Sequence, residues 1–230
     1  MKKIIAITML ALCTISATAQ DGANVSKPNI TTPPDSLNLD KAFYKKYMNV
    51  NGIAVCSSSQ VPDSCFEVVY KTFDALTRML PKEVMQSLIS HGARVTIMGK
   101  DEQTCDVPEH AYLAKDKKTD WNKRARGLGG SLWLPMSSCA EENIMHYAND
   151  RYFVEDITIH EFAHTIHDVG IVPVFKNFND ELRESLEAAK KEGKWLNTYA
   201  GSNIHEYWAE GVQDWFNVNK EVEQNNGDGV

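Results

Sequence analysis

The sequence has 230 residues, of which 43% are hydrophobic and 24% are charged, and its formal net charge is −7. This is ordinary globular composition, at a length that suits one sizeable core. The acidic balance argues against nucleic acid or an anionic membrane surface as a partner.

Residues 1–20 have the pattern of a secretory signal peptide. Lys2 and Lys3 precede an apolar run, and small residues then lead to a cleavage position after Ala19 or Gln20. We therefore expect a secreted or periplasmic protein. Its mature chain would have a net charge of −9, because cleavage removes both lysines from a chain of charge −7.

An alternative for the same segment is a lipoprotein attached through Cys13. The residue before this cysteine is Leu12, which is bulky where a small residue is normally needed. No other stretch approaches the ~18 apolar residues of a membrane span, so we expect none in the mature protein.

The rest of the chain divides into three parts. Residues 21–40 contain several prolines without periodicity and are expected to form an extended leader. A single folded domain is expected over residues 41–218, followed by a polar tail over residues 219–230.

Apolar patterns predict two strands and two helices early in this domain. The helical spacing of Phe66, Val69 and Phe73 predicts one helix, which Pro81 ends. High β-branched content predicts a strand inside a sheet further on. The expected elements are a strand at 52–55, helices at 62–80 and 82–90, and a strand at 93–98.

Residues 100–127 are polar and charged, and we expect a long surface loop whose basic residues, Arg126 among them, form a solvated face. Residues 127–135 then combine glycines, an alternating apolar pattern and Pro135, which cannot lie inside a sheet. An edge strand is therefore expected here. Such an edge can bind an extended peptide by main-chain hydrogen bonds, or it can be an ordinary edge ended by the proline.

Export leaves four cysteines, an even number that favours disulfides in an oxidising compartment. Of the three possible pairings we favour Cys56 with Cys65, which closes a short loop, and Cys105 with Cys139. Free buried thiols are the alternative. A zinc site made of thiolates is disfavoured, because the chain has no C-x-x-C pair.

The most informative stretch is the H-E-x-x-H motif His160-Glu161-Phe162-Ala163-His164. We expect a helix over residues 154–168, in which His160 and His164 lie one turn apart on one face and can bind one metal ion beside Glu161. The uncharged neighbours of the motif indicate a buried helix with its polar atoms on one stripe. The alternative is a core helix whose two histidines are satisfied by hydrogen bonds.

Two further helices are expected after the motif. Asn179 would cap an amphipathic helix over residues 180–192. The last helix covers residues 203–216 and carries Glu206 and Glu210 among aromatic residues.

A catalytic zinc ion has three protein ligands and an open position for water, so two histidines are not enough. His167 lies two turns, about 10 Å, from His160 along the helix axis and cannot converge with it, so we expect it at the helix end or behind the ligands. Glu206 and Glu210 share one helical face and would be costly to bury unless they engaged a metal or its histidines. The alternative is a solvent-facing acidic stripe.

These residues carry a resemblance to a known family. The H-E-x-x-H motif together with Tyr199, Asn203, Glu206 and Glu210 resembles the catalytic domain of the anthrax toxin lethal factor family of zinc peptidases. The resemblance spans about residues 128–218. The signal peptide, the cysteines and the small size differ from a large multidomain toxin, so the narrow substrate preference of that family is not carried over.

The resemblance implies the gluzincin arrangement. Zn²⁺ would be bound by His160, His164 and Glu206, with Glu161 as the general base and the Tyr199 hydroxyl steadying the developing oxyanion. Glu210, or alternatively Asp214, would orient a ligating imidazole through its second nitrogen.

The sequence thus predicts an exported zinc metallopeptidase that acts on protein or peptide. The expected fold is mixed α/β (α+β) and zincin-like, with a small mixed sheet whose edge strand lies beside an active-site helix, followed by a glutamate-bearing helix. One alternative is an exported zinc-containing binding protein without turnover, against which the presence of Glu161 and Tyr199 counts. The other is a zinc hydrolase of a non-peptide amide, which nothing in the sequence excludes.

Overall fold

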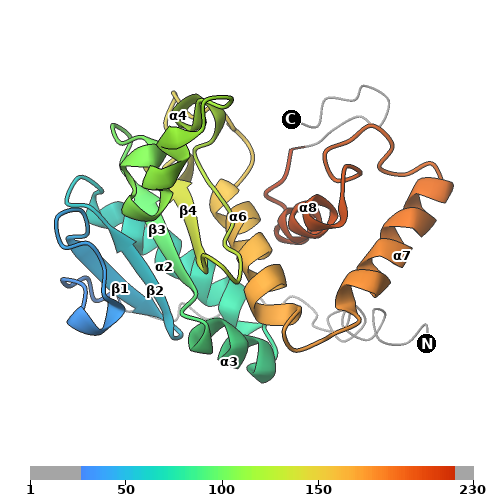
Figure 1. Cartoon of the computed structure of the whole chain (residues 1–230), viewed down its shortest axis with the longest axis horizontal. Coiled ribbons are helices and arrows are strands. Elements are labelled where there is room, and N and C mark those ends of the chain that lie inside the picture. The colour runs from blue at the N-terminus through green and yellow to red at the C-terminus, as the bar shows by residue number, and fades with distance from the viewer. Residues whose placement is uncertain (1–26, 221–230) are drawn as a thin grey trace, which may run out of the picture.

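A four-stranded mixed sheet lies at the centre of the structure, in the order β1-β2-β3-β4. In this computed structural model, which describes residues 27–220, β1 runs antiparallel to β2, whereas β3 runs parallel to both of its neighbours (Figure 1). The strands are β1 (Lys46–Val50), β2 (Ile53–Ser57), β3 (Arg94–Met98) and β4 (Met136–Ala140). The expected signal peptide and most of the expected polar tail lie outside the described residues.

Helices cover one face of the sheet and extend away from it (Figure 1). The α-helices are α2 (Asp63–Arg78), α3 (Lys82–Ser90), α4 (Trp121–Arg124), α5 (Glu141–Ile144), α6 (Ile157–Thr165), α7 (Phe178–Lys191) and α8 (Ile204–Phe216). The 3-10 helices are η1 (Asp35–Leu37), η2 (Thr104–Asp106) and η3 (Pro108–Lys115), and the π-helix is η4 (Ile166–Ile171). The predicted mixed α/β fold is confirmed, as are β2, β3, α2 and α3 close to their predicted bounds.

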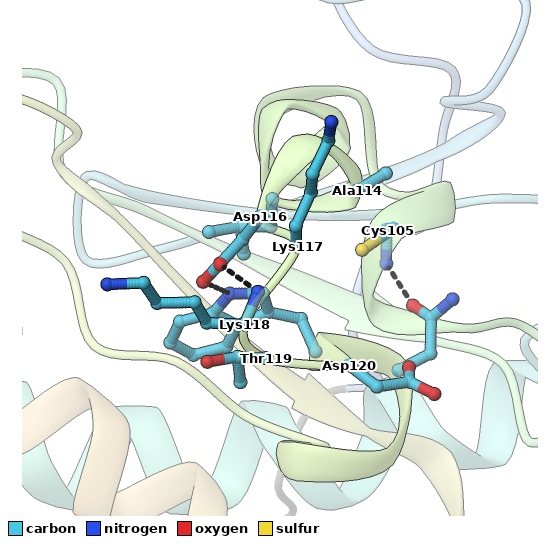
Figure 2. Close-up of a pocket in the computed structure, with 10 residues that line it drawn as sticks. Cys105, Ala114, Asp116, Lys117, Lys118, Thr119 and Asp120 are labelled. Atoms are coloured by element: carbon cyan, nitrogen blue, oxygen red, sulfur yellow. Dashed lines mark hydrogen bonds between the residues drawn. The ribbon is translucent and has the colours of Figure 1, made fainter.

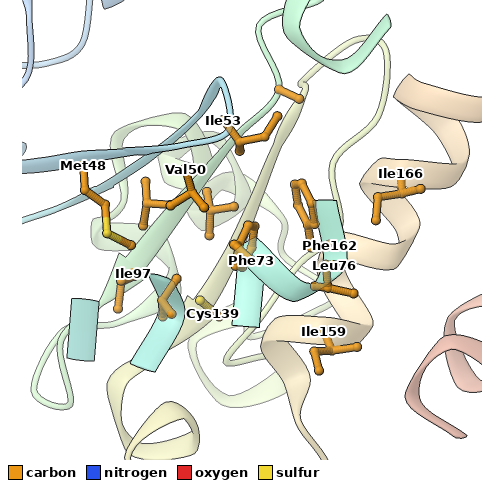
Figure 3. Packing of buried hydrophobic residues seen from close by; sticks show 14 of the residues in the cluster. Met48, Val50, Ile53, Phe73, Leu76, Ile97, Cys139, Ile159, Phe162 and Ile166 are labelled. Atoms are coloured by element: carbon orange, nitrogen blue, oxygen red, sulfur yellow. The ribbon is translucent and has the colours of Figure 1, made fainter. Parts of the chain in front are cut away.

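The main core lies between the sheet and helices α2, α3 and α6. Figure 3 shows Phe162 of α6 packed on Phe73 of α2, with ring centroids 4.4 Å apart. Ile159 and Ile166 lie on the same helical face as Phe162 and also join this core. Burial of each such side chain stabilises the fold by about 1.5–3 kcal/mol. This packing fixes α6 against the sheet and turns the face with the two motif histidines away from it.

The other face of the sheet is covered by the N-terminal segment and by residues 100–127. Leu37 and Leu39 of the N-terminal segment pack on the cluster of this face, which consists of Tyr44, Ala54 and Cys56. Thr31 lies at the edge of the sheet, where it exchanges two backbone hydrogen bonds of 2.8 Å with Tyr47 of β1. The expected surface loop at 100–127 is wrong in part, because it contains η2, η3 and α4 and buries several polar side chains. His110, for example, is buried and its Nε2 lies 3.0 Å from Ser138 Oγ. Hydrogen bonds of this kind allow a polar segment to pack on the sheet.

The outer part of that segment forms an open hollow of about 430 Å³, lined by Cys105, Leu113, Ala114 and residues 116–122. Asp116 accepts hydrogen bonds from the Lys118 amide and from the Trp121 indole N–H. Figure 2 shows Asp116 and Lys118 side by side at this hollow. None of the residues that line the hollow belongs to the H-E-x-x-H motif.

The edge strand lies later in the chain than predicted. Leu128 of the predicted segment pairs with Ser138 through two antiparallel hydrogen bonds, and the Pro135 carbonyl at its end accepts from the Arg94 amide of β3 at 2.9 Å. The strand β4 itself begins at Met136. The sequence of β4 is Met-Ser-Ser-Cys-Ala, and all five residues are buried. A buried strand is usually predicted from a continuous run of apolar residues, and two serines interrupt that run here.

The predicted disulfides do not form, and all four cysteines between residues 27 and 220 carry free thiols. Cys65 and Cys139 belong to the main core, whereas Cys56 lies on the opposite face of the sheet beside Tyr44. Cys105 lies in the segment that covers this opposite face. Each predicted pairing would therefore have to cross the sheet. Among the described residues no helix is both long and apolar enough to cross a membrane.

The helices around the motif differ from their predicted bounds. Helix α6 begins at Ile157 rather than 154, because the Asp156 side chain caps it by accepting from the Ile159 amide at 3.0 Å. The helix then continues as η4 to Ile171, past the predicted end. Asn179 does not cap the next helix, which starts at Phe178, two residues before the predicted start. It lies in the first turn of α7, and its side chain contacts His167.

Candidate metal centre

Helix α6 carries the two motif histidines, and its first turn is held from two sides. Asp156 provides the N-cap, and Asn143 Oδ1 accepts a hydrogen bond from the Ile157 amide at 2.8 Å. The rings of His160 and His164 lie 4.9 Å apart between centroids. These two hydrogen bonds fix the N-terminus of α6, and the helix presents both imidazoles on one face.

Helix α8 packs on α6 and supplies Glu206. Asn203 caps α8 by accepting from the His205 and Glu206 amides at 2.9 and 3.1 Å. The Trp208 indole N–H donates to the Ala163 carbonyl of α6 at 2.9 Å, and this bond ties the two helices together. The carboxylate of Glu206 is therefore brought opposite the histidines from a capped and anchored helix.

Three potential ligand atoms converge at this helix pair. His160 Nε2 lies 3.1 Å from Glu206 Oε2 and 3.2 Å from His164 Nε2, and His164 Nε2 lies 3.4 Å from the same carboxylate oxygen. A tetrahedral zinc ion with bonds near 2.0–2.1 Å separates its ligands by about 3.4 Å. The geometry and the donor set of two imidazoles and one carboxylate both fit zinc.

The second nitrogen of His160 is held by Gln213 and Glu210. Its Nδ1 lies 2.7 Å from Gln213 Oε1 and 3.4 Å from Glu210 Oε1. The amide oxygen of Gln213 can only accept, so Nδ1 carries the proton and the lone pair of Nε2 is free to bind a metal. Glu210 also accepts from Asn219 at 2.9 Å. The orienting role was predicted for Glu210, or alternatively Asp214, and not for Gln213. Asp214 instead accepts from Asn219 at 2.8 Å.

The electrostatics of the cluster favour a positive charge. Burial raises the pKa of the Glu206 carboxyl, but hydrogen bonds from His160 and His164 outweigh it and hold the pKa well below its ordinary value. Burial lowers the pKa of His160, yet the hydrogen bond to Glu206 and the charge of Glu161 raise it to about 9. A divalent cation would replace this proton among the same groups, and metal binding is expected to release it.

Two further side chains lie beside the cluster. Burial raises the pKa of the Glu161 carboxyl, against the opposing charges of His160 and His164. The ring of Tyr199 stacks beside that of His160, with centroids 6.2 Å apart and an angle of 24°. Burial also raises the pKa of the Tyr199 hydroxyl, which therefore stays protonated as a hydrogen-bond donor.

A glycine strap, residues 127–130, runs between the edge of β4 and helix α6. A Cβ atom at Gly129 would lie 2.6 Å from the Cβ of His164, and one at Gly127 would lie 2.9 Å from the Cγ of Glu161. Only glycine permits this close approach. Because Leu128 exchanges both hydrogen bonds with Ser138, the main-chain groups of Gly127 and Gly129 point away from β4. The strap thus presents main-chain donors and acceptors beside the cluster.

Arg126 fixes the start of the strap. Its guanidinium is mostly buried and donates to both carboxylate oxygens of Glu142, at 2.5 and 2.9 Å, and to the Gly99 carbonyl at 3.1 Å. The expected solvated face is therefore wrong for this residue. A bidentate pair of this kind gives a fixed geometry as well as charge neutralisation.

His167 lies apart from the three converging atoms. It is fully buried, and its Nε2 lies 2.7 Å from Asn179 Oδ1. Its other nitrogen faces Asp168 and His205, rather than His160 or Glu206. Sequence reasoning placed His167 at the helix end or behind the ligands, and the structure gives it a different set of neighbours.

Comparisons with known proteins add little to this geometry. No protein-family model matches the chain, and no curated protein matches it. Among solved structures, the chain is similar to the PRO-PRO endopeptidase (PPEP-2) from Paenibacillus alvei, with 17% identical residues and a TM-score of 0.42. The match covers 63% of this chain and 76% of that chain. At such a TM-score the function has to be inferred from the residues of the site.

Proposed function

We propose that this protein is an exported zinc-dependent metallopeptidase of the gluzincin type. The observation that carries the proposal is the convergence of His160, His164 and Glu206 from two helices onto separations that suit one zinc ion. The resemblance of these residues to the lethal factor family supports the same assignment. Export rests on the signal-peptide pattern of residues 1–20.

His160, His164 and Glu206 would hold the ion and leave one position open. When bound, zinc would polarise the scissile carbonyl and bring the pKa of a water molecule toward ~7. A ligand set with a single carboxylate suits this role, because the site keeps a net positive charge.

The residues of the chain would move the protons. The Glu161 carboxylate would accept a proton from the attacking water and pass it to the leaving amine nitrogen. Burial raises the pKa of this carboxyl, which makes its carboxylate a better proton acceptor. The Tyr199 hydroxyl would donate a hydrogen bond to the oxyanion that develops on the former carbonyl oxygen.

The glycine strap would bind the substrate. The outward-facing main-chain groups of Gly127 and Gly129 can pair with an extended peptide, as an added strand at a sheet edge. Because these glycines lie against His164 and Glu161, a peptide paired with them would run directly past the cluster. This arrangement favours a peptide over a non-peptide amide as substrate.

The test is digestion of an unbiased peptide library by purified zinc-loaded protein, with Glu161→Gln as the decisive variant. This substitution keeps all three ligands, so zinc content should remain at one ion per cluster while hydrolysis falls by about 10² to 10⁴-fold. Glu184→Gln, an exposed position on α7, is the matched control and should leave hydrolysis unchanged.

The outcomes separate the alternatives. Zinc binding without cleavage of any peptide by the wild-type protein would favour a binding protein without turnover. Cleavage of amides in cell-wall material but of no peptide would favour the non-peptide hydrolase. If Glu161→Gln keeps its activity, Glu161 is not the general base.

A further inference from the structure

A second group of potential metal ligands lies beyond the candidate metal centre. His167, Asp168 and His205 each offer one ligand atom, and these atoms lie within 4.8 Å of one another. His167 Nδ1 is 3.8 Å and His205 Nδ1 is 3.5 Å from Asp168 Oδ1. No residue is shared with the first group.

The Nδ1 atom of His167 provides a second observation, besides the clustering of the three side chains, that indicates a bound ion. His167 is 0% exposed, and its Nδ1 has no hydrogen-bond partner. Its Nε2 lies 2.7 Å from the side-chain oxygen of Asn179, which can only accept, so Nε2 carries the proton and Nδ1 has the lone pair. This lone pair faces the carboxylate of Asp168, and two acceptors that face each other are unfavourable unless a proton or cation lies between them.

The hydrogen bond to Asn179 matches the usual support of a metal-bound imidazole. Ligating histidines donate their other N–H to an oxygen, which fixes the tautomer and the ring orientation. Phe178 and Trp208 flank the ring, with centroids 5.5 and 5.9 Å from that of His167. The ring of His167 is therefore held in place before any ion binds.

The separations suit a small divalent ion. Ligands of tetrahedral zinc lie about 3.4 Å apart, close to the 3.5 and 3.8 Å found here. His167 and Asp168 are consecutive residues of the π-helix η4, a rare helix type that often occurs at functional sites. His205 is 45% exposed and leaves a path from solvent to the ion.

We propose that His167, Asp168 and His205 bind a second divalent transition metal ion, with two imidazoles and one carboxylate as ligands. Zinc is the expected ion, because this donor set is typical of it. The ion would join η4 to the first turn of α8, where His205 is adjacent to Glu206. Its role is structural, since it fixes the turn that delivers Glu206 to the first centre.

Zinc titration of the metal-stripped mature protein, followed by calorimetry and elemental analysis, tests the proposal. The wild-type protein should bind two ions per chain, and Asp168→Asn should bind one. His146→Asn removes an exposed imidazole elsewhere and should still bind two. Asn179→Ala should weaken only the second binding event, by about 10- to 100-fold.

If Asp168→Asn does not fold, a measurement on the wild-type protein still tests the proposal. In NMR spectra the imidazole signals of His167 and His205 should shift during addition of the second equivalent of zinc. Binding of a single ion by the wild-type protein, or shifts confined to His160 and His164, would overturn the proposal, as would a folded Asp168→Asn variant that binds two ions. The second event should persist in Glu206→Gln, so failure of the first centre is distinguishable from failure of the second.

Discussion

The Nδ1 atom of His160 lies 2.7 Å from Oε1 of Gln213, a residue 53 positions later in the chain. Gln213 is fully buried, and its amide nitrogen donates to the Asp156 carbonyl at 3.1 Å. The side chain therefore has one orientation, with its oxygen toward the histidine. It connects the start of α6 with the imidazole that α6 presents.

Replacement of Gln213 should weaken zinc binding without removal of a ligand. Gln213→Ala leaves Nδ1 of His160 without its fixed acceptor, and loss of such a partner typically lowers metal affinity by about 10- to 100-fold. Competition with a chelator measures the dissociation constant. Gln86→Ala, at an exposed position on α3, is the control and should change the constant little. Equal affinities in Gln213→Ala and the wild-type protein would show that Glu210 alone orients the ring.

Glu206→Gln and Glu210→Gln should behave differently. The first replaces an anionic ligand with a neutral amide, so the first centre should no longer add to the stabilisation of the fold by zinc, and any remaining effect would come from the second group. A ligand at 100 times its dissociation constant stabilises the native state by about 2.7 kcal/mol, or about 5–10 °C in Tm for a chain of this size. Thermal unfolding with and without zinc should show this shift in the wild-type protein and in Glu210→Gln. If only Glu210→Gln loses the shift, the ligand lies one helical turn later than assigned.

Gly129→Ala should disturb the first centre through contact alone. The added methyl group would lie 2.6 Å from the Cβ of His164, so the strap or the histidine must move. Lower zinc affinity and lower hydrolysis are expected together. Gly211→Ala is the matched control, because its methyl group meets nothing within 4 Å and lies inside α8, where alanine stabilises a helix by up to about 1 kcal/mol over glycine. Normal affinity in Gly129→Ala would mean that the strap moves freely.

His110 should make the fold sensitive to acid. Burial lowers its pKa from 6.5 to about 4, so the unfolded chain binds a proton more readily than the folded one. The neutral side chain therefore contributes stability that is fully present above pH 6.5 and is lost as the pH falls toward 4, by about 3 kcal/mol at most. Urea unfolding across this range should give a shallower pH dependence for His110→Gln than for the wild-type protein. His146→Gln, at an exposed position, should follow the wild-type curve.

Regular apolar spacing made α2 and α3 predictable, because the periodicity that buries Phe66 and Phe73 is visible in the sequence itself. The strand β4 was not predictable in this way, since its two serines resemble a loop and are compatible with burial only inside the finished fold. The same limit applies to the disulfide pairings, which depend on which face of a sheet each cysteine occupies.

For the candidate centre, the spacing within α6 and within α8 indicated which residues could share a face. Neither spacing predicts that the face of α6 with the histidines packs against the face of α8 with the glutamates. Gln213 was not predicted, because carboxylates are the usual partners of a ligating imidazole, whereas here a buried neutral amide accepts the hydrogen bond. Its position three residues after Glu210, on the same helical face, was the available signal.

The two helices after the motif bury few side chains. Leu186 is the one buried residue of α7, and Ala209 and Gln213 are those of α8. Regions with few buried apolar groups open locally at lower free energy than the core around them, and amide hydrogen exchange reports this opening. Glu206 is thus carried by a helix with few buried side chains, while both histidines lie on a core helix. The ion could therefore enter and leave when α8 opens briefly while the sheet stays folded. Its exchange rate would then depend on the free energy of this local opening as well as on the affinity of the three ligands.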